Sequence, residues 1–297
     1  MTLSRAVRLA VNAADVAAAS PAPPTSLPPA HESAHTPPAT APFRRADQPS
    51  SARNGYAGSP ALVGMGRHFE LLIRCRGPID VRTGYFMDIK RIDDAARRGA
   101  LPILAHACAR DRDPAAVVRE LFAALNPVLG GALTELRLAL SPFFSVAMES
   151  AFMSPSAPPR AVLRQRFEIA AAHRLHVDAL SAADNRALFG RCNNASGHGH
   201  NYIIEPEVEV ALDAPHAFAL SDLERLVHTH IIDPFDHAHL NLDTAEFNTA
   251  RGGVNPSVEN IARVFFERLA PGIAGAGAVL RRITVFETEK TSATYPA

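Results

Sequence analysis

Two histidines separated by a single residue, His198 and His200, lie in a segment whose pattern is that of a β-strand. Residues two apart on a strand project from the same face, and this face also carries the apolar residues Tyr202 and Ile204. His173 lies on the apolar face of an earlier predicted strand, which can pair antiparallel with the second. Three neutral imidazoles that converge in this way match an open tetrahedral zinc site, with the fourth position left for water or substrate. The alternative is three core histidines satisfied by backbone carbonyls.

Further residues near this segment have the chemistry of proton transfer. Cys192 lies six residues before His198, and the neighbouring Arg191 and a nearby metal would lower the pKa of its thiol. The resulting thiolate suits a base or a nucleophile, whereas the alternatives are an inert thiol and a fourth zinc ligand. Asp236 precedes His237 in a predicted loop, where the carboxylate would orient the imidazole for proton transfer. A solvated Asp-His pair is the alternative.

A carboxylate on the apolar side of the last predicted strand indicates a binding role. Glu287 alternates with Ile283 and Val285, so we expect it to be buried. A buried carboxylate must be paired, and an amino-heterocycle that presents two N–H groups would satisfy it bidentately. A salt bridge to Arg281 or Arg282 is equally compatible with the sequence.

Composition limits the class of protein. The chain has 297 residues, and Lys plus Arg equal Asp plus Glu at 30 each, so the formal net charge is zero. A general nucleic-acid binder would carry a basic excess, and no apolar stretch reaches the roughly 18 residues of a membrane-spanning helix, so we expect neither partner. Three cysteines cannot make a disulfide framework, which favours a reducing, cytoplasmic compartment. Nine of the 13 histidines fall between His173 and His239.

The strands that position these residues belong to an α+β domain over residues 160–297. Alternating apolar and polar residues predict strands over 166–173, 198–212 and 283–287. A further short strand can follow before the end of the chain. Pro206 removes a hydrogen-bond donor from the second strand, so a bulge or a sheet edge is expected there.

Two helices are predicted between the second and third strands. Ser221 and Glu224 have the spacing of a capping box that begins the first helix. Asn255-Pro256 begins the second, which runs through Leu269 and is stopped by Pro271-Gly272.

The amino-terminal half, residues 1–155, repeats this plan in degenerate form. Four pairs of segments match in the same order, at offsets of roughly 130 to 142 residues, as a duplicated domain would give. The pairs are Gly64–Phe69 with Gly197–Tyr202, Ala105-His106 with Asp236-His237, Asp113-Pro114 with Asn255-Pro256, and Val146–Glu149 with Thr284–Glu287. On this register residues 7–10 form a strand; chance similarity, and a targeting peptide over residues 3–14, are the alternatives. Ten prolines between Pro21 and Pro60 predict a disordered insert at about residues 20–60.

The motifs of the carboxyl-terminal half resemble the 6-pyruvoyltetrahydropterin synthase and 6-carboxytetrahydropterin synthase family, which has the tunnelling fold (T-fold). The resemblance covers Arg166 to Thr288. It rests on six segments: Phe167–Leu175, Leu188–Asn194, Gly197–Tyr202, Phe235–His237, Asn255–Asn260 and Val285–Thr288.

The resemblance implies roles for individual residues. It implies zinc on three histidines, His173, His198 and His200. It implies Cys192 as catalytic base, assisted by Asp236 and His237, and Glu287 as the anchor of the pterin ring, with Glu259 beside the pterin pocket. Members of this family form trimers that pair into hexamers with active sites between subunits, so a homo-oligomer is expected. Its T-fold is an antiparallel four-stranded sheet with two helices on one face, and the chain would hold two of these in tandem.

Both branches of the family start from 7,8-dihydroneopterin triphosphate. Five residues separate Cys192 from His198, a spacing that resembles the 6-pyruvoyl enzymes rather than the 6-carboxy enzymes. In the amino-terminal half Met65 and Arg67 replace the zinc histidines, Ala13 stands roughly at the position of His173, and a catalytically inactive copy is expected. The alternative from another class is a zinc-containing pterin-binding or scaffold protein without turnover. A structural zinc would more usually have four protein ligands, which favours the enzyme.

Overall fold

The computed structural model describes residues 1–19, 62–153, 158–212 and 218–297. The expected disordered insert at about 20–60 lies outside these described residues. The chain divides into two compact units, Met1–Leu138 and Ala139–Ala297. The boundary expected from the sequence, between residues 155 and 160, falls further along the chain, within the second unit.

The first unit is built on three strands in the order β1-β2-β3, which are β1 (Thr2–Val11), β2 (Arg67–Arg76) and β3 (Leu133–Ala139). β1 and β2 pair antiparallel, with Val7 opposite Leu71. Alternate residues of β2, from Phe69 to Cys75, are buried while those between them are partly exposed. The opening segment is therefore a strand, as the comparison of the two halves predicts.

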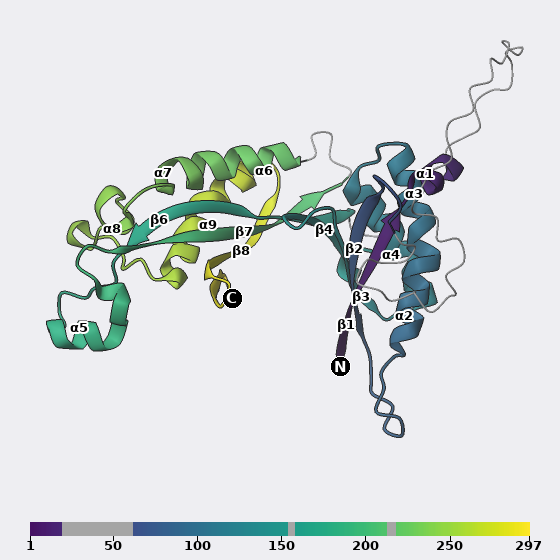
Figure 1. Cartoon of the computed structure of the whole chain (residues 1–297), viewed down its shortest axis with the longest axis horizontal. Coiled ribbons are helices and arrows are strands. Elements are labelled where there is room, and N and C mark those ends of the chain that lie inside the picture. Colours follow the sequence, from purple (N-terminus) through teal and green to yellow (C-terminus); the bar gives the residue numbers. More distant parts are fainter. Residues whose placement is uncertain (20–61, 154–157, 213–217) are drawn as a thin grey trace, which may run out of the picture. The chain divides into compact units, whose positions relative to one another are not determined.

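Helices cover the apolar face of this unit (Figure 1). They are α1 (Ala13–Ala19), α2 (Ile89–Ala95), α3 (Leu101–Ala109) and α4 (Pro114–Val128), and a π-helical turn at Ala96–Ala100 joins α2 to α3. Asp113 caps α4 by accepting a hydrogen bond from the Ala116 N–H, so the Asp113-Pro114 pair begins this helix. α4 contributes Leu121 and Phe122 to the core.

The second unit has its own antiparallel strands, in the order β4-β5-β7-β8-β9, with β6 also paired to β7. The strands are β4 (Phe144–Glu149), β5 (Arg160–Gln165), β6 (Phe167–His173), β7 (His198–Ala211), β8 (Val279–Thr288) and β9 (Thr291–Tyr295). β6 is the strand predicted over residues 166–173, and β5, separated from it only by Arg166, is a strand that the sequence pattern does not predict. The prediction of helices with an antiparallel sheet is confirmed, and β9 is the further short strand.

Two long helical segments pack on this sheet, α6 (Leu220–Val227) and α9 (Val258–Gly275). α9 lies against β8 and β9, and α6 packs on α9 (Figure 1). Further helices occupy the connections: α5 (Ala182–Phe189), α7 (Asp233–Phe235) and α8 (Leu240–Asp243). A π-helical turn lies at His228–Ile232, and 3-10 turns lie at Ser150–Met153, Gly190–Asn193 and Thr249–Arg251. In the described part of the chain no helix is both long and apolar enough to cross a membrane.

Both predicted helix boundaries need correction. α6 begins after Ala219, whose N–H donates to the Asp222 carboxylate, so Ser221 is inside the helix rather than its cap. α9 continues through Pro271-Gly272 to Gly275 instead of stopping there. A Cβ at Gly272 would lie 2.9 Å from Leu226, so this glycine permits the close approach of α9 to α6 and does not end the helix.

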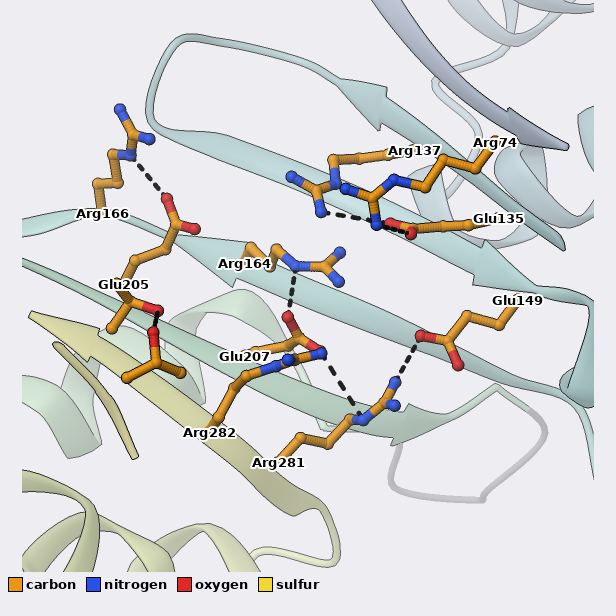
Figure 2. Close-up of polar contacts among 12 residues, drawn as sticks. Arg74, Glu135, Arg137, Glu149, Arg164, Arg166, Glu205, Glu207, Arg281 and Arg282 are labelled. Atoms are coloured by element: carbon orange, nitrogen blue, oxygen red, sulfur yellow. Dashed lines mark hydrogen bonds and ion pairs between the residues drawn. The ribbon is translucent and has the colours of Figure 1, made fainter. Parts of the chain in front are cut away.

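Glutamates and arginines form ion pairs across the strands of this sheet (Figure 2). Glu207 on β7 accepts hydrogen bonds from Arg164 at 2.8 Å and from Arg282 at 3.1 Å. Arg281 donates to Glu149 at 2.6 Å. The pairing passes from Arg282 opposite Glu207 to Leu280 opposite Val208, so Arg281 is the extra residue of a bulge. The bulge expected at Pro206 therefore occurs one residue further on, and the extra residue belongs to β8.

Candidate active site

The pairing of β6 with β7 brings the three candidate zinc histidines together. His173 lies opposite His198, and Ala171 lies opposite His200. The ring centroids of His173 are 4.6 Å from His198 and 5.2 Å from His200, and the last two rings are 4.7 Å apart. Two histidines separated by one glycine on β7, together with His173 on the neighbouring β6, are sufficient to produce this triangle.

His173 is fully buried and held from one side. Its Nδ1 lies 2.8 Å from the carbonyl oxygen of Pro256 and 3.3 Å from the hydroxyl of Tyr202. A carbonyl oxygen only accepts, so Nδ1 carries the proton and Nε2 of the neutral ring carries the lone pair. Burial is the largest cause that lowers the pKa of His173; the Pro256 contact opposes it and the neighbouring histidines add to it. Together they bring the pKa to about 4, so the ring is neutral at pH 7.

The remaining ring nitrogens also face the centre of the triangle. His173 Nε2 lies 3.2 Å from His198 Nε2, and His200 Nε2 is buried with no hydrogen-bond partner among the described residues. Burial, then the proximity of His200, lowers the pKa of His198, although the charge of Glu287 acts in the opposite direction. An Nε2–H of His198 would donate to His173; if both Nε2 atoms carry lone pairs, the two rings repel unless a proton or a cation lies between them.

Glu287 lies directly beside this triangle. Its Oε1 is 3.5 Å from His173 Nε2 and 3.6 Å from His200 Nε2, and the side chain is 17% exposed. The alternative of a salt bridge to Arg281 or Arg282 is wrong, because the ion pairs of these arginines are with Glu149 and Glu207. The carboxylate is therefore available to the site.

Cys192 completes the cluster from the 3-10 turn at Gly190–Asn193. Its sulfur and the ring nitrogens of His173 and His198 lie within 4.8 Å of one another. Burial, then the negative charge of Glu287, raises the pKa of the thiol. The expectation that Arg191 lowers this pKa is wrong. Arg191 is exposed, whereas the sulfur is half-buried beside a carboxylate.

These donors fit a divalent metal ion. His173, Cys192 and His198 form one group that could hold a metal, and His173, His200 and Glu287 form another; both lie in the second unit. Imidazole, thiolate and carboxylate are the ligands that zinc takes in proteins. The unpartnered Nε2 of His200 and the Nε2 atoms of His173 and His198, 3.2 Å apart, are the atoms that a cation would contact.

Asp236 and His237 form a pair at a different place, along β6. His237 Nδ1 lies 2.9 Å from Asp236 Oδ2, and Asp236 Oδ1 accepts a hydrogen bond from the Ala170 N–H at 2.8 Å. This backbone hydrogen bond, together with His237, lowers the pKa of Asp236 despite some desolvation. The His237 side chain is 82% exposed, and the Asp236 carboxylate lies against its Nδ1. The structure therefore does not bring this pair to the histidine triangle within the single chain.

Glu259 lies in the first turn of α9 and is exposed. It follows Pro256, whose carbonyl holds His173, by three residues. No described contact of its carboxylate leads into the histidine triangle, so its place beside a pterin pocket stays a prediction.

Three further residues hold the triangle, and their sequence patterns do not mark them as site residues. They are Pro256, Tyr202 as a hydroxyl, and His239, whose backbone bridges to Ala172 and whose ring lies against Gly197. In the sequence Asn255-Pro256 indicates only a helix start, and Tyr202 indicates only the apolar face of its strand.

The amino-terminal match of Glu149 with Glu287 is wrong. Glu149 lies on β4, whereas Glu287 lies on β8, the strand that directly follows α9. In the amino-terminal half the strand after the last helix is β3, and Glu149 lies one strand later. Glu149 pairs with Arg281 and has no counterpart role in a ligand site.

Comparison with known proteins identifies the carboxyl-terminal half. Residues 162–297 match the sequence profile of 6-pyruvoyl tetrahydropterin synthase. A putative 6-pyruvoyl tetrahydrobiopterin synthase of Caenorhabditis elegans is 39% identical over 127 residues, which is 42% of this chain and 86% of the relative. The 6-pyruvoyl tetrahydrobiopterin synthase of Homo sapiens is 33% identical over 138 residues, 46% of this chain and 91% of the relative.

One solved structure is also similar to part of the chain. The 6-pyruvoyl tetrahydropterin synthase of Caenorhabditis elegans matches with a TM-score of 0.42 and 32% identity, covering 47% of this chain and 97% of that one. The relatives named above are enzymes of the lyase type. On the identity and coverage of these relatives, the chain belongs to the 6-pyruvoyl tetrahydropterin synthase family.

Proposed function

We propose that residues 160–297 form a zinc-dependent synthase that acts on 7,8-dihydroneopterin triphosphate, eliminates triphosphate and yields 6-pyruvoyltetrahydropterin. The names of the relatives support the reaction class. The five residues between Cys192 and His198 favour this product over 6-carboxytetrahydropterin. The single observation that carries the proposal is that three histidines, a cysteine and a glutamate lie close together where β6 ends and β7 begins.

His173, His198 and His200 would hold the zinc ion. When bound, zinc supplies positive charge that makes carbon-bound protons beside a coordinated substrate hydroxyl more acidic and favours the thiolate form of a neighbouring cysteine. The Pro256 carbonyl and the buried position of His173 keep that ring neutral and oriented for this purpose.

Cys192 acts as the base. It removes a proton from a side-chain carbon of the substrate, the triphosphate group leaves with the electrons of its C–O bond, and a proton returned by His237 completes the rearrangement to the keto side chain. Asp236 fixes the orientation of His237 through the contact at 2.9 Å. Because this pair is exposed and away from the triangle in one chain, it would act on a substrate held at the neighbouring subunit of a homo-oligomer.

Glu287 anchors the pterin ring. Its carboxylate is partly buried, free of the arginines on its own strand and adjacent to the histidines, so two N–H groups of the pterin would pair with its two oxygens. Glu259, at the start of α9, lies at the rim of the same pocket in this proposal.

The amino-terminal half is proposed to be a second, inactive T-fold domain. Its order of two strands, two helical segments and two strands parallels that of the active half, while Met65 and Arg67 replace the zinc ligands. The three free cysteines fit a cytoplasmic location.

Product analysis tests the function directly. The full chain with zinc is incubated with 7,8-dihydroneopterin triphosphate, and the products are identified by chromatography and mass spectrometry. We expect inorganic triphosphate and 6-pyruvoyltetrahydropterin in equal amounts. Detection of 6-carboxytetrahydropterin as the product would assign the chain to the other branch of the family. Binding of the pterin without triphosphate release would show a binding protein instead of an enzyme.

A further inference from the structure

The turn that carries Cys192 is tied to the residues that follow His173. The Leu175 N–H donates to the carbonyl oxygen of Cys192 at 2.8 Å. The side-chain amide of Asn193 donates to the carbonyl oxygen of Leu175 at 2.7 Å. The backbone of the proposed base is therefore held against the chain two residues beyond a proposed zinc ligand.

His176 receives the second hydrogen of the same amide group. Asn193 Nδ2 lies 3.0 Å from His176 Nδ1, and Arg174 Nη2 lies 3.2 Å from the same nitrogen. Amide and guanidinium nitrogens only donate, so His176 Nδ1 is the acceptor and the ring proton lies on Nε2. His176 Nε2 faces Asp178 Oδ1 at 3.4 Å, which suits that tautomer.

The backbone of His176 also reaches the loop that orients His173. The His176 N–H donates to the side-chain oxygen of Asn255 at 3.3 Å. The next residue, Pro256, accepts the Nδ1 proton of His173. Asn260 closes this loop by donating to the carbonyl oxygen of Asn255 at 2.8 Å. His176 thus touches the cysteine turn through its ring and the histidine-orienting loop through its backbone.

We propose that His176 is a positioning residue for Cys192: by accepting the Asn193 amide at Nδ1, it holds the cysteine turn at a fixed distance from the histidine triangle. This inference rests on the proposed function only in treating Cys192 as the base. The ring is 28% exposed, so it is not a core residue that fills space. Its two donors and one acceptor are all polar, which is the pattern of a hydrogen-bonded support rather than of packing.

The position of the thiol gives the hydrogen bond between Asn193 and His176 a measurable consequence. Cys192 is half-buried, so a reagent in solution reaches its sulfur only in part. A turn released from His176 exposes the sulfur, so the thiol becomes more accessible to an alkylating reagent. The same release moves the base away from its productive distance and lowers kcat, because small displacements of a reacting group cost large factors in rate.

Two substitutions at His176 separate the acceptor from the ring. His176→Phe keeps a ring and removes the acceptor, whereas His176→Asn places an amide oxygen near the position of Nδ1. Asn193→Ala removes the donor from the other side. His228→Phe, at an exposed histidine of the second unit, is the matched control. All are made in the full chain, and zinc content and the far-ultraviolet spectrum confirm that each variant is folded and loaded.

The rate of Cys192 alkylation by iodoacetamide is followed at one fixed pH by peptide mass spectrometry, which separates Cys192 from Cys75 and Cys108. We expect about tenfold faster alkylation in His176→Phe and Asn193→Ala, with kcat about tenfold lower and KM within about twofold. His176→Asn should recover most of both, and His228→Phe should match the wild-type protein.

Wild-type alkylation and kcat in both His176→Phe and Asn193→Ala would overturn the proposal. Failure of His176→Asn to recover either readout, with zinc retained, would also overturn it, since the acceptor would then not be the feature that matters. The proposed function can fail separately. If Cys192→Ala keeps full turnover while the alkylation results are as expected, His176 still positions the turn, but Cys192 is not the catalytic base.

Discussion

His173 donates its Nδ1 proton to the carbonyl oxygen of Pro256 over 2.8 Å, from a strand to a loop 83 residues further along the chain. The contact leaves the lone pair of the neutral ring on Nε2, 3.2 Å from His198 Nε2. A helix start that the sequence marks only as Asn255-Pro256 thereby fixes the tautomer of a histidine in the candidate metal site. The orientation of the site depends on the attachment of α9 as well as on the sheet.

Removing one histidine should remove the metal. In His200→Ala we expect zinc binding at least about 100-fold weaker, because two imidazoles remain of the three that converge. Zinc content after dialysis against a weak chelator measures this. His228→Ala, at an exposed histidine, should keep one zinc per chain; equal zinc retention in both variants would remove His200 from the ligand set.

Gly197 should matter for its lack of a side chain. It has φ +70, and a Cβ there would lie 2.6 Å from His239 Nε2 and 3.0 Å from the carbonyl oxygen of His173. Gly252 has φ +87 and nothing within 4 Å of a Cβ. Both alanine variants lose about 1–2 kcal/mol from the left-handed backbone. We expect weaker zinc binding, measured by competitive chelation, in Gly197→Ala alone. Equal zinc affinity in the two variants would show that the close approach to His239 has no role in shaping the site.

Glu287→Gln should weaken pterin binding with the fold intact. The substitution keeps the size of the side chain and removes a charge worth about 1.5–3 kcal/mol when it is hydrogen-bonded. Calorimetric titration of the zinc-loaded protein with a pterin that lacks the triphosphate measures the effect. Glu289→Gln, at an exposed position beyond the end of β8, is the control. Unchanged affinity in Glu287→Gln would end its assignment as the pterin anchor.

Glu207 should stabilise the second unit in a pH-dependent manner. Burial alone would raise the pKa of Glu207, but the charge of Arg164 and the hydrogen bonds from Arg282 and Arg164 outweigh it and lower that pKa from its ordinary value of 4.5. A carboxyl with a lowered folded-state pKa contributes stability above the unfolded-state pKa, and this stability is lost as the pH falls through the folded-state value.

Glu207→Gln is therefore expected to cost about 3 kcal/mol at pH 7, because Arg164 is only 6% exposed and would lose its buried partner. Urea unfolding at pH 7 and at pH 3 measures the difference, which should shrink at the lower pH. Glu205→Gln is the control: its arginine, Arg166, is 43% exposed, and the cost should stay within about 1 kcal/mol. A pH-independent cost for Glu207→Gln would mean that its charge is not the stabilising feature.

Local patterns predicted the triangle of histidines well because alternation along a strand is a short-range rule. His198 and His200 must share a face of their strand, and the sequence leaves open only which strand pairs with it. The same rule placed Ile283, Val285 and Glu287 on one face of the last strand, and all three lie on β8.

Contacts between distant segments could not be predicted in this way. Nothing in the sequence near Cys192 indicates that His176 accepts a hydrogen bond from its turn, or that Glu287 raises the pKa of its thiol. Pro271-Gly272 predicts a helix end because proline lacks a donor, yet α9 continues to Gly275 and Gly272 lies close against α6.

The rate of triphosphate release from 7,8-dihydroneopterin triphosphate, compared between the wild-type chain and Cys192→Ala at equal zinc content, tests the central claim most directly. Cys192 lies within 4.8 Å of nitrogens of His173 and His198 but is assigned as base rather than as ligand. The account predicts stoichiometric triphosphate release by the wild-type protein and a loss of at least about 100-fold in Cys192→Ala, with one zinc per chain in both. Wild-type release rates in Cys192→Ala, or no release by the zinc-loaded wild-type chain, would contradict it.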